Sequence, residues 1–402
     1  MLLLLEFYVR LEFDHVPQQP HIAIMNTSTS SFLPAQMARP DKIMVAMSGG
    51  VDSSVTAAEI LASGIDCAGM FMKNWEEDDD AEHCPAARDA DDARAVAEQL
   101  GLPFYARNFA SEYWDHVFED FLQDYRSGRT PNPDILCNKE IKFKVFLDHA
   151  HDLGASHMAT GHYVRKRVHD GRHELLRGVD TNKDQSYFLY AITQQQLAAA
   201  VFPVGAMHKP DVRLRARQAG LPVHDKKDST GICFIGERRL SDFLARWLPP
   251  RAGDIRDTRG QVLGQHHGAQ FFTLGQRQGL GIGGVRGAAD APWYVIGKDM
   301  ASNIVYVSQQ HDHVCLHSHS MQLEQINWIA GHAPEQQHLT AKIRYRQADQ
   351  NCELQLNDGD TAAVHFSSAQ WAAMPGQSVV FYADEQCLGG GVIAATDAEQ
   401  LS

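Results

Sequence analysis

Residues 46–55 read AMSGGVDSSV, and this stretch decides how the rest of the chain is interpreted. An apolar run at residues 43–47 precedes it and predicts a strand, while a helical pattern opens at Ser53. Gly49 and Gly50 supply a turn between the two elements, because they carry no Cβ. Such a turn aims backbone N–H groups and the positive end of a helix at one place. The stretch therefore predicts a phosphate-binding loop.

The loop differs from the Walker type of nucleotide-binding loop. A Walker loop needs G-x-x-x-x-G-K-[ST], whose lysine reaches the terminal phosphates, and no such lysine follows Gly50. Transfer of the terminal phosphoryl group is therefore disfavoured. The order SGGVDS resembles instead the signature of the PP-loop ATP pyrophosphatases, which bind the β,γ-phosphates and transfer AMP to a substrate oxygen. An ordinary serine-glycine turn would not require a strand, two glycines, an acid and paired serines in this order.

Strands and helices alternate after this loop, which predicts an α/β fold with a parallel sheet. Ligands of such sheets bind beyond the carboxyl ends of the strands, so residues 48–53, 73–74 and 161–163 should meet around ATP. After about Arg238 short alternating segments with Gly and Pro turns predict mostly β structure. The expected strands cover 42–47, 66–72, 103–107, 262–264, 293–297, 304–307 and 379–382, and the expected helices 53–64, 89–100 and 112–125.

Length and composition predict a cytoplasmic, globular protein. The 402 residues are 44% hydrophobic and 21% charged, enough for about two or three domains. No apolar run is long enough for a membrane span, and residues 2–5 are too few for a signal sequence. Seven cysteines without an export signal suit a reducing cytosol. Residues 1–40 form an irregular extension, which makes Met25 or Met37 an alternative translation start.

Charge is distributed unevenly along the chain. The net charge of −14 argues against a nucleic-acid partner, yet residues 161–260 hold 18 Lys and Arg against 11 Asp and Glu. This basic region favours binding of a polynucleotide. Solvated helix faces explain part of it, and residues 213–217 are interpreted as one such face.

Two cysteines lie in distinctive surroundings. Cys137 follows Pro-Asn-Pro at 131–133, where a helix beginning near Asp134 would stabilise a thiolate. Asp134 would share a helix face with the thiol and could exchange a proton, although its charge disfavours the thiolate. Cys233 lies in KKDSTGICF at 226–234, where lysines favour a thiolate. Two buried structural thiols remain the alternative at this point.

The motifs, taken in order from about Asp41 to Gly391, resemble those of tRNA-specific 2-thiouridylases. The GMP, NAD and argininosuccinate synthetases share the phosphate loop but not the two cysteine segments. Ala46 is a small departure, because glycine often precedes Met-Ser in the family. The motifs are SGGVDS, FMKNW, PNPDILCNKEIKF, ATGHY, NKDQSY, DSTGICFIGE, TLGQRxGLGIGG, IRYR and PGQ.

The resemblance implies three domains and an ATP site. A PP-loop catalytic domain is expected at 41–237, a small central domain at 238–312 and a C-terminal β-barrel at 313–402. Mg²⁺ should accompany ATP, because divalent ions neutralise its phosphates. The ATP-binding residues that the resemblance implies are Ala46, Met47, Ser48, Gly49, Gly50, Val51, Asp52, Ser53, Met72 and Gly161.

The resemblance also implies a mechanism. ATP adenylates the C2 oxygen of the wobble uridine in an anticodon stem-loop, and pyrophosphate leaves. A persulfide on Cys233, loaded by a sulfur-donor protein, replaces that oxygen, while Cys137 is the catalytic thiol and pairs with Cys233 in a transient disulfide. Asp134 is the acid/base, and Asn132, Pro133 and Asp134 face the target base. The tRNA contacts that it implies are His162, Lys183, Asp184, Gln185, Arg344, Tyr345 and Gln377.

Three further patterns are interpreted as carrying no catalytic role. Residues 279–284 fit G-x-G-x-x-G but lack a strand-to-helix unit, and we interpret them as a loop near tRNA. His311, His313, Cys315, His317 and His319 alternate as on one face of a strand, which we expect to be solvated and to join two domains rather than bind a metal. Residues 76–80 are an acidic run typical of a solvated loop.

Two alternative functions fit parts of the sequence. An iron–sulfur thiolase would hold a cluster with Cys137, Cys233 and a third ligand, Asp134 or Cys84, but the chain has no C-x-x-C. A catalytically silent tRNA-binding protein would need none of Asp52, Cys137 and Cys233. The sequence therefore favours a sulfurtransferase that acts on tRNA, without a metal centre, a membrane or DNA.

Overall fold

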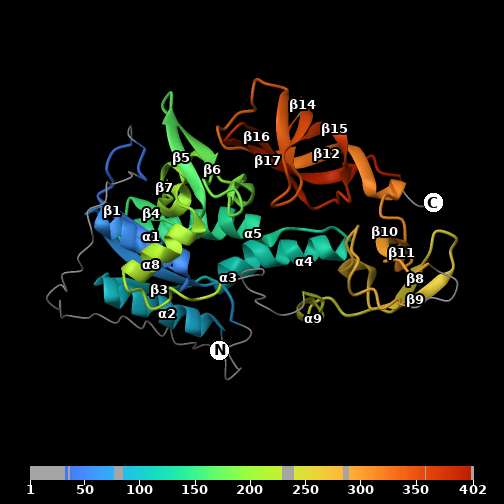
Figure 1. Ribbon diagram of the computed structural model, residues 1–402, viewed down its shortest axis with the longest axis horizontal. Helices are drawn as coiled ribbons and strands as arrows, with labels where there is room; N and C mark the ends of the chain where they lie inside the picture. The colour runs from blue at the N-terminus through green and yellow to red at the C-terminus, as the bar shows by residue number, and fades with distance from the viewer. Residues whose placement is uncertain are drawn as a thin grey trace, which may run out of the picture.

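The first sheet, which Figure 1 shows among the helices of the N-terminal half, is parallel throughout. The computed structural model describes residues 32–34, 37–76, 85–228, 240–283, 289–357 and 359–399. The strand order is β3-β2-β1-β4-β7, and each neighbouring pair is parallel, which confirms the predicted α/β fold. The strands are β1 (Lys42–Ala46), β2 (Asp66–Lys73), β3 (Phe104–Asn108), β4 (His157–Ala159) and β7 (Ala200–Val201).

Both faces of this sheet are buried, which explains why its central strand reads as a continuous apolar run. Ile43 and Val45 belong to a core shared with α1, α2 and α8. Met44 and Ala46 point to the other face, into a core shared with the helices between residues 110 and 152. The covering helices are α1 (Val51–Ala62), α2 (Pro85–Leu100), α3 (Ala110–Tyr113), α4 (Glu119–Arg126), α5 (Pro133–Leu136), α6 (Phe146–Asp152), α7 (Gln194–Ala198) and α8 (Lys209–Gln218).

Two segments within these helices are π-helical. They are η1 (Trp114–Phe118), which joins α3 to α4, and η2 (Cys137–Val145), which joins α5 to α6. The helix predicted over 112–125 is confirmed as the run from α3 to α4, although sequence periodicity did not indicate its π-helical part. π-Helical turns inside longer helices often occur at functional sites, and η2 begins at Cys137.

A second sheet follows, with strand order β10-β11-β8-β9 and a small core of its own. Short helix α9 (Leu240–Leu244) precedes it, and its Phe243 packs with Trp75 and Phe118 of the first domain, at ring-centroid distances of 5.5 and 5.9 Å. The strands are β8 (Gly253–Arg256), β9 (Val262–His266), β10 (Tyr294–Asp299) and β11 (Ile304–Ser308). Mostly β structure after residue 238 is therefore confirmed.

The third sheet contains a closed barrel, as predicted. Six strands run in the order β12-β15-β14-β13-β16-β17, and an additional β12–β17 pairing closes the ring. A hairpin of β5 (Val164–His169) and β6 (Arg172–Arg177) extends the sheet, because β6 pairs with β17. The barrel strands are β12 (His317–Trp328), β13 (His338–Lys342), β14 (Gln350–Leu356), β15 (Ala362–Trp371), β16 (Ser378–Ala383) and β17 (Gln386–Thr396).

The strand expected across the alternating histidines is wrong for its first half. Residues 314–316 form a 3-10 turn, and β12 begins only at His317. Cys315 is buried with Leu316 and Ala372, and the His313 ring accepts a hydrogen bond from the Cys315 backbone N–H at 3.3 Å. Burial of this thiol and the turn cap override the period-two pattern. In the described part of the chain, no group of three or more His, Cys, Asp or Glu could hold a metal ion.

The loop before α5 contacts both other domains. The Thr130 N–H donates to Pro375 O in the barrel domain at 2.9 Å, and the Thr130 hydroxyl lies 3.4 Å from that of Thr273 in the central domain. Gly376 has a φ of +91°, and a Cβ there would lie 2.8 Å from Thr130 N. The PGQ motif thus packs directly on the loop that leads to Asn132.

In the described residues, no helix combines the length and apolarity that crossing a bilayer requires.

Gly376→Ala should destabilise the protein by about 2–4 kcal/mol, because it adds a steric clash to the strain of a left-handed backbone. Gly359→Ala is the matched control. Its φ is +73°, and nothing lies within 4 Å of the position that its methyl group would take, so only about 1 kcal/mol is expected. Chemical denaturation of both variants measures the difference. Equal losses of stability in the two variants would contradict the predicted clash of the added methyl group with Thr130.

Candidate functional site

The predicted phosphate loop joins β1 to α1 and is held closed by serine hydroxyls. The Ser48 N–H donates to Ser53 Oγ at 3.2 Å, and Ser53 and Ser54 donate to Gly50 O at 3.1 and 2.8 Å. Gly49 has a φ of +72°, and a Cβ there would lie 2.2 Å from Asp89 O, so only glycine fits. Gly50 is the N-cap, and α1 begins at Val51, two residues earlier than predicted.

The loop after β4 packs against the phosphate loop, as the sequence predicts. A Cβ on Gly161 would lie 2.9 Å from Ser53 N, which shows how closely the two backbones approach. The Tyr163 hydroxyl donates to Asp52 Oδ1 at 2.8 Å, and burial, together with this carboxylate, raises the pKa of Tyr163. Lys73 ends β2, which is paired with β1, so its loop leaves from the same edge of the sheet.

The other residues predicted to bind ATP lie in or next to β1, at the start of α1 and near the end of β2. Ser48 is exposed, whereas Met47 and Val51 are buried, so these two can offer a ligand only their backbone. Met72 is half-buried near the end of β2. Ala46 is the last residue of β1. Contact of any of them with nucleotide stays a prediction.

A lysine far along the chain reaches the acid of the loop. Lys209 Nζ lies 2.7 and 2.8 Å from the two carboxylate oxygens of Asp52, and 2.8 Å from Asp228 Oδ1. Asp228 also pairs with Lys183 at 2.6 Å and with Arg213 at 2.7 Å. Burial raises the pKa of Asp228, but hydrogen bonds from Lys183 and Lys209 outweigh burial and lower that pKa to about 2.

A second lysine holds the loop from its other side. Lys226 Nζ donates to Gly49 O at 3.0 Å and to Asp89 at 2.8 Å, and it also pairs with Asp92. Burial lowers the pKa of Lys226, but the two carboxylates outweigh burial and raise it.

The prediction that 213–217 is a solvated face is wrong for Arg213, which binds Asp228. It holds for Arg217, whose side chain is 59% exposed.

Sequence reasoning did not find Lys209, because a single lysine before Pro210 has no distinctive spacing. Lys226 and Asp228 lie within the quoted Cys233 stretch KKDSTGICF, so their place in a predicted site was a signal that could have been used. Tyr163 lies in the quoted ATGHY motif, but that motif does not reveal that its hydroxyl meets Asp52.

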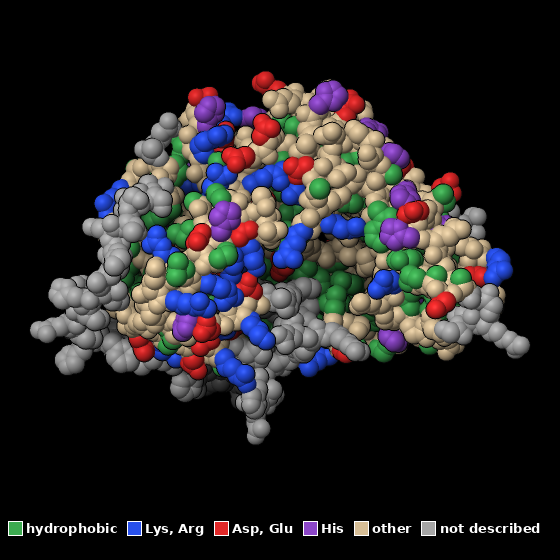
Figure 2. Space-filling model, in the orientation of Figure 1, with side chains coloured by type: hydrophobic (Ala, Val, Ile, Leu, Met, Phe, Trp, Pro, Cys, Tyr) green, Lys and Arg blue, Asp and Glu red, His purple; other side chains and the backbone are tan. Residues whose placement is uncertain are grey.

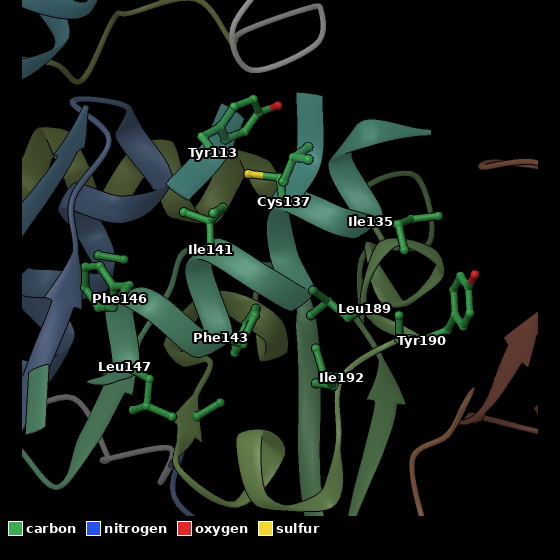
Figure 3. Close-up of a cluster of buried hydrophobic side chains, with 14 of the residues drawn as sticks. Tyr113, Ile135, Cys137, Ile141, Phe143, Phe146, Leu147, Leu189, Tyr190 and Ile192 are labelled. Atoms are coloured by element: carbon green, nitrogen blue, oxygen red, sulfur yellow. The ribbon is translucent and has the colours of Figure 1, made fainter. Parts of the chain in front are cut away.

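The helix expected near Asp134 begins at Pro133, with Asn132 as its N-cap. The Asn132 side-chain oxygen accepts the Asp134 N–H at 3.1 Å, and Pro133 takes the first helical position. Cys137 lies in its second turn, as predicted, and is 1% exposed. Figure 3 shows Cys137 beside Tyr113 and Ile141, within a buried hydrophobic cluster. A substrate can reach this thiol only if its surroundings rearrange.

The Cys137 helix contacts the phosphate-loop region through His162. The Phe143 ring in η2 lies 5.9 Å from the His162 ring, whose Nδ1 pairs with the Thr160 hydroxyl at 2.8 Å. Burial lowers the pKa of His162 well below its ordinary value, and the charge of Lys142 adds to this effect. His162 connects the two predicted parts of the site, η2 and the loop after β4.

The predicted tRNA contacts fall into two groups, one in the first domain and one in the barrel domain. Phe188, three residues after Gln185 of the first group, has its ring 4.6 Å from the ring of Tyr345 in the second group, so the two groups lie close together. Asp184 is buried and accepts hydrogen bonds from the N–H groups of Gly178 and Ser186, both at 3.1 Å. Gln185 accepts the Tyr163 N–H at 2.9 Å. Asp184 and Gln185 therefore fix the local backbone, and their contact with tRNA stays a prediction.

The second group lies in the barrel domain. Arg344 donates to Ala372 O at 2.7 Å, and burial lowers the pKa of its guanidinium. Gln377 accepts the Met374 N–H at 3.1 Å. Both side chains are half-buried, and their contact with tRNA also stays a prediction. Cys233, Cys84, residues 77–80 of the acidic run and Gly284 lie outside the described residues.

Known proteins resemble the chain over nearly all of its described length. Residues 41–237 match a family described as the tRNA methyl transferase HUP domain, 241–309 its PRC-barrel domain, and 318–393 an aminomethyltransferase β-barrel domain. Curated proteins named tRNA-specific 2-thiouridylase MnmA, from Methylococcus capsulatus and Pseudomonas aeruginosa, are 55% and 54% identical. They match over 88% and 90% of this chain and 96% of each relative. The chain belongs to the tRNA-specific 2-thiouridylase family.

Within the 2-thiouridylase family the relatives are named for thiolation, whereas the domain description names methyl transfer. A solved structure described as a 4-thiouridine synthetase–RNA complex with bound ATP has 16% sequence identity and a TM-score of 0.32. The match covers 47% of this chain and 43% of the synthetase chain. The TM-score is too low for any inference about this protein to rest on it.

Buried neutral His162 should make stability depend on pH. The pKa of His162 in the folded protein lies well below the ordinary value of 6.5, which applies to the unfolded chain. At a pH between the folded and the unfolded pKa the unfolded chain binds more protons, so stability falls as the pH falls. The melting temperature should decrease from pH 7.5 to pH 5, and His162→Gln should decrease less. The substitution should remove only part of the pH dependence, because burial also lowers the pKa of His157 to about 4.

Exposed His151 provides the control, and His151→Gln should follow the wild-type pH profile. Thermal denaturation followed by circular dichroism across this pH range makes the comparison. Parallel profiles for wild type and His162→Gln would contradict a buried, neutral imidazole at this position.

Proposed function

We propose that this protein is a cytoplasmic tRNA 2-thiouridylase, which uses ATP and a cysteine persulfide to replace the C2 oxygen of a wobble uridine by sulfur. The observation that carries the proposal is the contact chain from the phosphate loop to the Cys137 helix, in a chain 55% identical to a named 2-thiouridylase. A methyl transfer would not need a phosphate-binding turn such as the one at Ser48–Ser53.

Activation of the uridine comes first, because oxide is a poor leaving group. The C2 oxygen attacks the α-phosphorus of ATP, the bond from that phosphorus to the bridging oxygen breaks, and pyrophosphate takes the electron pair. The turn at Ser48–Ser53 supports this step, because it sits at the start of α1 with Gly49 and Gly50 free of side chains. The adenylated C2 oxygen can then leave as part of AMP when sulfur attacks C2.

The residues present fit Mg²⁺ bound chiefly by ATP. Asp52 is a carboxylate at the loop, and Mg²⁺ in nucleotide sites commonly takes one or two carboxylates, phosphate oxygens and water. When bound, the ion would neutralise phosphate charge. Asp52 would then be its protein ligand, while the N–H groups at the start of α1 orient the phosphates.

Sulfur delivery requires both predicted cysteines. The terminal sulfur of a Cys233 persulfide attacks C2, and AMP leaves with the oxygen. The Cys137 thiolate then attacks the Cys233 sulfur, which breaks the bond to the transferred sulfur and forms a Cys137–Cys233 disulfide. An external thiol reductant supplies two electrons to restore both thiols. Asp134, in the first turn of the Cys137 helix, is proposed as the proton carrier.

Substrate binding must uncover Cys137, which is 1% exposed. Enzymes that modify a base take it out of the stack, and a flipped uridine entering beside Asn132–Asp134 is proposed to do this. Figure 2 shows a hollow in the molecular surface between the first domain and the barrel, with Lys and Arg side chains beside it. We propose that the anticodon stem-loop binds over this hollow, and that a persulfide-bearing protein supplies the sulfur.

Two measurements separate the proposal from its alternatives. Iron content and visible absorbance of anaerobically purified protein test the iron–sulfur thiolase, in which Cys137 and Cys233 would hold a cluster. Pyrophosphate release that depends on tRNA tests the silent tRNA-binding protein. Stoichiometric iron, or no pyrophosphate release, would contradict the proposal.

Cys233→Ser should keep tRNA-dependent pyrophosphate release within about twofold while losing 2-thiouridine formation by at least about 100-fold, because activation and sulfur delivery use different groups. Cys352→Ala is the control, since that thiol is buried in the barrel and burial raises its pKa to about 12. Mass spectrometry of digested tRNA and a pyrophosphate assay give the two readouts. Full thiolation by Cys233→Ser would refute the persulfide role.

A further inference from the structure

The phosphate loop lacks the lysine that reaches the terminal phosphates in Walker-type loops, yet the fold brings one to it. No lysine follows Gly50 in the loop, but Lys209 Nζ contacts both carboxylate oxygens of Asp52. We propose that Lys209, the first residue of α8, binds the β,γ-phosphates of ATP and stabilises the pyrophosphate that leaves. This inference rests on the proposed ATP-dependent thiolation and adds a residue to its activation step.

The surroundings of Lys209 hold its ammonium group at the loop. Its side chain is only 10% exposed, and its backbone N–H donates to Asp180 Oδ2 at 2.9 Å. The ammonium lies 5.8 Å from the centre of the Tyr163 ring, whose hydroxyl donates to the same Asp52. A long cationic side chain that would otherwise be free in solvent is thus immobilised beside the start of α1. Little side-chain entropy remains to be lost when an anion binds.

The charges around Lys209 allow it to change partners at low cost. Asp228 keeps Lys183 at 2.6 Å and Arg213 at 2.7 Å even without Lys209. Asp52 keeps the Tyr163 hydroxyl and would hold the magnesium ion that accompanies ATP. Lys209 can therefore move from these half-buried carboxylates to a phosphate without leaving either of them uncompensated. Its charge is then available where negative charge grows as the bond to the α-phosphorus breaks.

Other lysines at the site are less suited to this role. Lys226 donates to the backbone oxygen of Gly49 and pairs with Asp89 and Asp92, so its charge is taken up on the outer side of the loop. Lys183 pairs with Asp228, and no contact joins it to Asp52 within the described residues. Of the described lysines, Lys209 is the one that contacts the acid of the SGGVDS motif.

The test compares ATP with AMP, because only ATP carries the phosphates that Lys209 should bind. Calorimetric titration of full-length Lys209→Gln with each nucleotide and Mg²⁺ should show ATP binding weakened about 10- to 100-fold, as for the loss of a charge-assisted hydrogen bond. AMP binding should stay within about twofold of wild type. Lys209→Arg keeps the charge and should recover most of the ATP affinity.

Arg215→Gln is the matched control, because Arg215 lies on the same helix but pairs with Glu59 at 3.1 Å. It should bind both nucleotides as wild type does. If Lys209→Gln does not fold, Lys209→Gln combined with Asp228→Asn removes the charge imbalance and takes its place in the titration. Unchanged ATP affinity, or equal losses for ATP and AMP, would overturn the inference while leaving thiolation standing. Wild-type protein that binds neither nucleotide would overturn the proposed function as well.

Discussion

The central position of β1 in the parallel sheet is the constraint on which the site depends. β1 lies between β2 and β4, and parallel pairing forces the loops after these three strands to one edge. This places Asp52 within contact distance of Gly161 and Tyr163, although more than a hundred residues separate Asp52 from these two along the chain. The same geometry buries both faces of the strand, so the loop rests on a rigid base.

The barrel domain contributes to this site indirectly. Its Pro375–Gly376 turn packs on Thr130, and Thr130 begins the stretch that leads through Asn132 into the Cys137 helix. The β5-β6 hairpin, which leaves the loop after β4, pairs with barrel strand β17. Two connections therefore run from the barrel to the two sides of the proposed active site. A tRNA held by the barrel would be held in register with the loop at residues 130–134, which is proposed to bind the uridine.

Much of this arrangement could be predicted from local sequence. Gly49, Gly50 and the apolar run before them specify a turn that has few alternatives, and Pro-Asn-Pro followed by Asp134 specifies the start of a helix. Side-chain partnerships across the fold could not be predicted in this way. Lys209 meets Asp52 only because α8 packs beside α1, and no spacing encodes that. The histidine alternation at 311–319 misled for a related reason, since Cys315 is buried by contacts distant in sequence.

The central claim is that an adenylyl group makes the C2 oxygen of the uridine a leaving group. Its most direct test is a single turnover with tRNA that carries ¹⁸O at C2 of the wobble uridine, followed by mass spectrometry of the AMP released. We expect one ¹⁸O atom in that AMP for each 2-thiouridine formed. AMP without the label, alongside full formation of 2-thiouridine, would contradict it.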